Sequence, residues 1–93
     1  MHLVISGRVQ RVWYRDWMVA EARVLGVSGW VRNRGDGQVE ALVSGADDAV
    51  DQLVAACHRG PERAKVRGIE AALAPMPDGL PDGPAGFDRI ADA

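Results

Sequence analysis

The residues best suited to chemistry lie in one short stretch, where Gly7 opens a turn and Arg15 follows it. An alternating apolar run precedes the turn and a helix-like pattern follows, so a strand is expected to lead through the turn into a helix. The first N–H groups of a helix lack partners and attract anions. The guanidinium of Arg15 can hold two phosphate oxygens at once. On spacing alone, an arginine in this position is more often a solvated side chain.

A second polar position is Asn33, at the end of a strand expected over residues 27–33. It opens the turn Asn33-Arg34-Gly35-Asp36-Gly37, whose glycine and Asx content is typical of a hairpin connection. Asparagine is common in turns because its side chain bonds the nearby backbone. Taken alone, the residues favour that structural role for Asn33.

Two blocks of the sequence resemble the signatures of the acylphosphatase family. Residues 7–15, GRVQRVWYR, resemble the first signature, which reads G-R-V-Q-G-V-x-F-R. Residues 29–33, GWVRN, followed by DGQV at 36–39, resemble the second, G-W-V-x-N with D-G-x-V. The blocks keep the family's order and separation, and the resemblance covers nearly the whole chain.

The resemblance implies hydrolysis of a small acyl phosphate to a carboxylate and inorganic phosphate, by direct attack of water and without a metal or cofactor. Carried over by position, Arg15 binds the phosphate and Asn33 orients the attacking water. The backbone N–H groups that form the cradle around the phosphate belong to Arg8, Val9, Gln10, Arg11 and Val12. The leaving carboxylate needs no general acid, since its conjugate acid has a pKa of about 4. In agreement, no histidine–carboxylate cluster has metal-ligand spacing, and no Ser/His/Asp or Cys/His arrangement stands out.

Arg11 is the one departure inside the first block, because the family has glycine there. If that position requires a positive φ, a non-glycine residue costs about 1–2 kcal/mol of strain. The loop could then shift and turn fewer amides toward phosphate, which would reduce the rate. Alternatively, Arg11 keeps a permitted conformation and its guanidinium adds attraction for the anion.

The elements that position these residues follow from the apolar spacing. We expect strands over 2–9, 27–33, 38–44 and 64–74, helices over 14–25 and from Asp47 to Arg59, and a short last strand over 87–91. Gly26 suits the end of the first helix, and a bulge is expected around Gly68. Residues 75–86 read as a loop because they hold four of the five prolines. His2 has no evident partner and is assigned to the surface.

The expected order is β-α-β-β-α-β with an extra strand, which is typical of a ferredoxin-like α/β sandwich of the α+β class. Both helices then pack on one face of a four- to five-stranded antiparallel sheet. Ninety-three residues suffice for one modest core, so residues 1–93 are expected to form a single domain. Acylphosphatases share this fold, but the fold alone hosts many functions.

The charge distribution supports a small anionic ligand. The net charge is −2, but residues 1–35 carry six arginines against two acidic residues, and residues 36–93 carry five basic against eleven acidic groups. A cationic cleft on an acidic body suits a small anion better than a nucleic acid. A solvated arginine-rich face would give the same counts.

Cys57 is the single cysteine and lies on the apolar stripe of the second helix, so we interpret it as a small buried hydrophobe. One cysteine cannot form an intramolecular disulfide, which fits a reducing compartment and a cytoplasmic protein. No apolar run approaches the roughly 18 residues that span a membrane. Nothing in the sequence demands more than a monomer.

Two other functions remain open at this stage. One is a catalytically weak module of the same fold that binds phosphate or carbamoyl phosphate. The other is an RNA-binding sandwich, which needs exposed aromatic residues on its central strands, although residues 2–9 and 38–44 contain none. The three tryptophans within the first thirty residues are interpreted as core anchors rather than stacking platforms.

Overall fold

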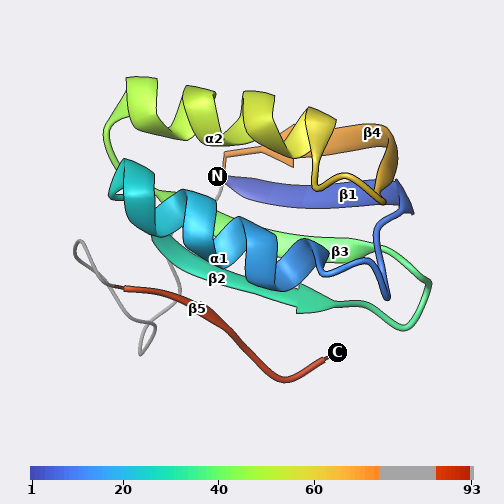
Figure 1. Ribbon diagram of the computed structural model, residues 1–93. Helices are drawn as coiled ribbons and strands as arrows, with labels where there is room; N and C mark the ends of the chain where they lie inside the picture. The colour runs from blue at the N-terminus through green and yellow to red at the C-terminus, as the bar shows by residue number, and fades with distance from the viewer. Residues whose placement is uncertain (74–85, 93) are drawn as a thin grey trace.

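The computed structural model describes residues 1–73 and 86–92, which form two helices and five strands (Figure 1). In chain order these elements are β1 (His2–Arg8), α1 (Tyr14–Leu25), β2 (Ser28–Asn33), β3 (Val39–Ser44), α2 (Asp47–Arg59), β4 (Lys65–Ala72) and β5 (Phe87–Arg89). No helix in these ranges is long and apolar enough to cross a bilayer.

The strands form one sheet in the order β4-β1-β3-β2-β5, and both helices lie over one of its faces (Figure 1). This confirms the expected ferredoxin-like α+β sandwich. The expectation of a wholly antiparallel sheet was wrong, because β5 pairs parallel to β2 at the sheet edge. β4 runs antiparallel to β1, and β1 and β2 share one direction, so a strand that reverses direction after β4 and pairs with β2 must be parallel to it.

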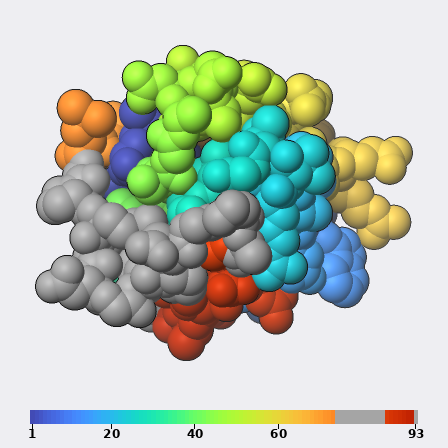
Figure 2. All heavy atoms as spheres, turned by 90° about the vertical axis from the view of Figure 1, so that its left-hand side faces the viewer, coloured from blue at the N-terminus to red at the C-terminus, as the bar shows by residue number. Residues whose placement is uncertain are grey.

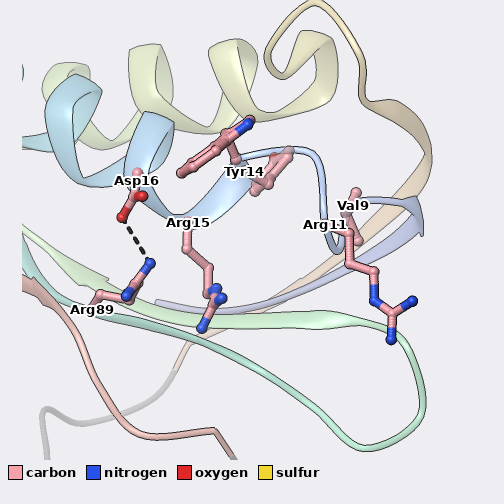
Figure 3. A pocket seen from close by; sticks show the side chains of 7 residues that line it. Val9, Arg11, Tyr14, Arg15, Asp16 and Arg89 are labelled. Atoms are coloured by element: carbon pink, nitrogen blue, oxygen red, sulfur yellow. Dashed lines mark hydrogen bonds and ion pairs between the residues drawn. The ribbon is translucent and has the colours of Figure 1, made fainter.

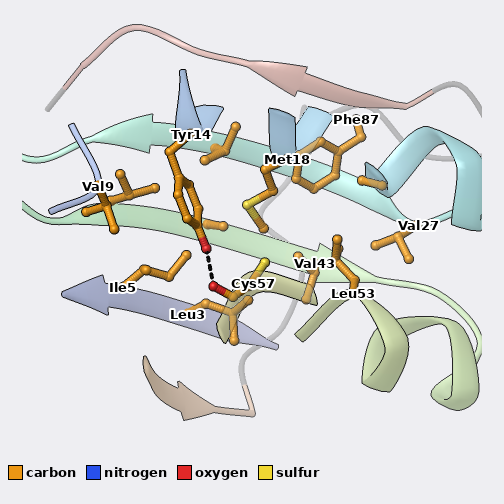
Figure 4. Close-up of a cluster of buried hydrophobic side chains, with 14 of the residues drawn as sticks. Leu3, Ile5, Val9, Tyr14, Met18, Val27, Val43, Leu53, Cys57 and Phe87 are labelled. Carbon is orange, nitrogen blue, oxygen red and sulfur yellow. Dashed lines mark hydrogen bonds between the residues drawn. The ribbon is translucent and has the colours of Figure 1, made fainter. Parts of the chain in front are cut away.

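The core lies between the sheet and the two helices (Figure 4). Its largest fully buried side chains are Tyr14, Phe87, Leu3, Ile5, Met18 and Leu53. The hydroxyl of Tyr14 donates a 2.7 Å hydrogen bond to the backbone carbonyl of Cys57, which ties α1 to α2 through the core. Burial raises the pKa of the Cys57 thiol to about 11, so it stays protonated at neutral pH. Cys57 is therefore a buried apolar residue, as predicted.

The sequence pattern located the elements closely. Helix α1 spans the predicted residues, and Gly26 ends it with φ 73° while its N–H bonds the carbonyls of Ala22 and Arg23. The register between β1 and β4 shifts where Ser6 pairs with Gly68, which confirms the bulge predicted there. The strands differ from their predicted ranges by one or two residues at their ends. Apart from Gly86, the predicted loop over 75–86 lies outside the described residues.

His2 has a partner that the sequence did not reveal, although its side chain is partly exposed. Its Nε2 lies 2.7 Å from Glu40 Oε2, and Arg32 Nε donates to Glu40 Oε1 at the same distance. The strand register places the three residues on the sheet face opposite to Leu3 and Ile5. Burial opposes the charged form of Glu40, but the hydrogen bonds from His2 and Arg32 outweigh it and lower the pKa of this carboxyl.

Helix α1 lies between α2 and β5, as the view of the molecule from its side shows (Figure 2). Two ion pairs fasten β5 to this helix. Arg23 meets Asp88 at 3.0 Å, and Arg89 meets Asp16 at the same distance. The last strand is therefore held against the helix that carries Arg15.

Gly7 lies at the register shift near the end of β1, and the structure leaves no room for a side chain there. Its φ is +122°, and an added Cβ would lie 2.1 Å from the carbonyl oxygen of Lys65. We predict that Gly7→Ala lowers the free energy of unfolding by about 3 kcal/mol. Urea denaturation measures this loss. Gly35→Ala is the matched control, because nothing lies within 4 Å of its added Cβ; equal midpoints for both variants would contradict the prediction.

Candidate active site

Three strand ends meet at one edge of the sheet. Strands β1 and β2 both run antiparallel to β3, and β5 runs parallel to β2, so β1, β2 and β5 share one direction. Their carboxyl ends therefore lie at the same edge (Figure 1). There β1 leads into residues 9–13, β2 ends at Asn33, and β5 leads to Asp92. Residues far apart in the sequence are thus brought together by strand direction.

Buried side chains and hydrogen bonds fix the loop over residues 9–13. Val9 and Val12 are buried and anchor it to the core. The side-chain amide of Gln10 donates to the carbonyls of Arg34 and Gln38, at 2.8 and 2.9 Å. These bonds hold the loop against the hairpin that begins at Asn33, so the two signature blocks form one unit.

Two loop residues adopt left-handed backbone conformations without being glycine. Arg11 has φ 63° and Trp13 has φ 64°. Arg11 therefore has the positive φ that the family glycine suggested. Its guanidinium is exposed and points away from Arg15 (Figure 3). Trp13 is 75% exposed, so its interpretation as a core anchor was wrong, whereas Trp30 is buried as expected.

Trp13 occupies the cap position of α1, and its side chain makes no capping hydrogen bond. The first N–H groups of the helix therefore keep their capacity to bind an anion. A cavity of about 230 Å³ opens beside them (Figure 3). Its lining residues are Val9, Arg11, Trp13, Tyr14, Arg15, Asp16 and Arg89. The loop and Arg15 thus share one cavity, and its lining combines three arginines and one aspartate with apolar and aromatic side chains.

Arg15 and Asn33 meet through a carboxylate of the C-terminal segment. Arg15 Nη1 donates to Asp92 Oδ1 at 2.9 Å, and the backbone N–H of Asn33 donates to the same oxygen at 3.2 Å. The side-chain oxygen of Asn33 is buried and has no hydrogen-bond partner among residues 1–73 and 86–92. The site thus presents two donors to an anionic oxygen and one acceptor that is unsatisfied.

Sequence reasoning found Arg15, Asn33 and the loop, and the structure places them at one edge. It missed Asp92, Arg89 and the side-chain role of Gln10. Nothing in the local pattern marks a carboxylate near the end of the chain as a partner of Arg15, since 77 positions separate them. In the described part of the chain, no group of three or more His, Cys, Asp or Glu residues could hold a metal ion.

Comparison with known proteins identifies the family of this α+β sandwich. The acylphosphatase family model matches residues 1–83. The acylphosphatase of Acidiphilium cryptum is 55% identical over 76 residues, which cover 82% of this chain and 84% of the relative. The chain belongs to the acylphosphatase family.

Solved structures agree with this assignment. The acylphosphatase from Bacillus subtilis superposes with a TM-score of 0.84 at 31% identity, covering 96% of this chain and 94% of that one. HypF of T. kodakarensis superposes with a TM-score of 0.81 at 26% identity. That match covers 99% of this chain and 12% of HypF, so the same fold also occurs as a small part of a longer protein.

The left-handed conformation of Arg11 yields a stability prediction. Replacing Arg11 with glycine removes the steric cost of positive φ, so we expect Arg11→Gly to stabilise the protein by about 1 kcal/mol. Thermal and urea unfolding measure the change. Arg63→Gly is the control: Arg63 is also exposed but has no positive φ, and glycine there should destabilise slightly. A loss of stability in both variants would show that Arg11 carries no such strain.

Proposed function

We propose that this acylphosphatase family member hydrolyses small acyl phosphates to a carboxylate and inorganic phosphate by direct attack of water. The observation that carries the proposal is the shared oxygen of Asp92. Arg15 and the N–H of Asn33 both donate hydrogen bonds to this one anionic oxygen, and a phosphoryl oxygen could accept the same two bonds. Membership of the family and the acylphosphatase name of the A. cryptum relative support the reaction type.

The reaction requires mainly that the reactants are positioned and that negative charge in the transition state is stabilised. Water forms a bond to phosphorus while the bond from phosphorus to the acyl oxygen breaks, and its electron pair leaves with the carboxylate. The transition state spreads negative charge over the equatorial phosphoryl oxygens, where fixed donors and a cation stabilise it. In the proposal Arg15 supplies the cation, and the backbone N–H groups of Arg8, Val9, Gln10, Arg11 and Val12 supply the donors.

Asn33 serves the attacking water. Its unsatisfied side-chain oxygen is an acceptor, and a buried acceptor without a partner costs about 1–3 kcal/mol. In the proposal the site opens enough for a water to donate to this oxygen, which satisfies the oxygen and orients the water toward phosphorus. An amide cannot take the proton, so a phosphoryl oxygen of the substrate accepts it.

The proposal includes neither a metal nor a cofactor, and its partners are the acyl phosphate and the phosphate product. The net charge of −2 argues against nucleic acid as a partner. We further propose a cytoplasmic monomer of one domain that does not bind membranes. The lone, buried and reduced Cys57 supports the compartment.

The first test is hydrolysis of benzoyl phosphate in the presence of excess chelator. We predict turnover by the wild type that the chelator does not change. Arg15→Ala and Asn33→Ala should each lower kcat/KM by about 100-fold, because each removes a group that acts on the transition state.

Arg23→Ala is the matched control, since Arg23 lies on the same helix and pairs with Asp88 outside the cavity. It should keep kcat/KM within about twofold of the wild type. A folded wild type without turnover would refute the enzymatic proposal and leave a phosphate-binding module as the remaining function.

A further inference from the structure

We propose that Asp92 is an internal anion that competes with the substrate phosphoryl group and thereby sets the affinity of the site. This inference rests on the proposed function for the identity of the ligand. Its structural basis is that one carboxylate oxygen accepts hydrogen bonds from both Arg15 Nη1 and the N–H of Asn33. Asp92 thus engages Arg15, the cation assigned to the phosphoryl group, together with the adjacent N–H of Asn33.

Contacts of the segment before Asp92 hold its carboxylate beside Arg15 and Asn33. Arg89 pairs with Asp16 on α1, and the N–H of Ile90 bonds the carbonyl of Val31 on β2 at 3.0 Å. Two residues later the chain reaches the edge where β1 and β2 end. A group tethered in this way acts at a high effective concentration that a free ligand must overcome.

Joint occupancy of the site by Asp92 and a phosphoryl group is disfavoured by charge. A carboxylate and a phosphate that share the same two donors would lie within a few ångströms of each other, and like charges at that distance repel. Binding of the substrate therefore requires Asp92 to leave. Displacement is feasible because the pair is partly solvated, with 27% of the Arg15 side chain and 52% of the Asp92 side chain exposed.

The Asp92 contact also explains a local anomaly of α1. Arg15 places a cation in the first turn of a helix, where the dipole makes it unfavourable. The carboxylate of Asp92 offsets this charge until a phosphoryl group replaces it. In contrast, Asp88 pairs with Arg23 at 3.0 Å near the far end of α1 and touches neither Arg15 nor Asn33.

The test compares wild type, Asp92→Asn and Asp88→Asn in titrations with inorganic phosphate. The dissociation constant is read from the amide resonance of Asn33 in nitrogen-15 NMR spectra. We expect Asp92→Asn to bind phosphate about fivefold more tightly than the wild type, since a partly exposed ion pair no longer competes. The KM for benzoyl phosphate should fall by a similar factor, while kcat changes less than twofold. Asp88→Asn should match the wild type in all three values.

Unchanged or weaker phosphate binding by Asp92→Asn would overturn the proposal, because Asp92 would then be indifferent to the anion or would support Arg15. An equal effect of Asp88→Asn would overturn it too, since a general loss of negative charge would suffice. A different result would refute the proposed function and leave the role of Asp92 standing. Tighter phosphate binding by Asp92→Asn without hydrolysis by any of the three proteins would support the internal competitor and refute only the enzymatic reaction.

Discussion

Strand direction is the constraint on which the site depends. Because β1, β2 and β5 run in parallel, the loop after β1, the end of β2 and the segment after β5 meet at one edge. None of these segments could form the site alone. The loop provides backbone donors, β2 provides Asn33, and α1 provides the Arg15 guanidinium above them. A slip of one residue in any of these strands would turn its side chains to the other face and separate the groups.

The loop stores strain that the rest of the fold must offset. Two non-glycine residues, Arg11 and Trp13, have positive φ, and each costs of the order of 1 kcal/mol. Burial of Val9 and Val12 and the two hydrogen bonds from Gln10 hold the loop in this form. Such a rigid loop suits a reaction whose catalysis consists mainly of placing fixed donors around developing charge.

The sequence predicted what depends on local pattern and on the two signature blocks. Helical spacing and Gly26 located α1, and the family resemblance selected Arg15 and Asn33, which residue type alone would have assigned to solvent and turn. The parallel pairing of β5, the contact of His2 with Glu40 and the position of Asp92 were not predictable. Each depends on how segments distant in sequence are aligned, and no periodicity records that alignment.

We expect the edge formed by β1, β2 and β5 to hold a phosphoryl group. A crystal structure determined with inorganic phosphate tests it most directly. We predict one phosphate oxygen within hydrogen-bonding distance of both Arg15 Nη1 and the N–H of Asn33. Further oxygens should face the N–H groups of residues 8–12, and Asp92 should be displaced. Phosphate bound at another place, or phosphate at this edge with Asp92 still bonded to Arg15, would contradict it.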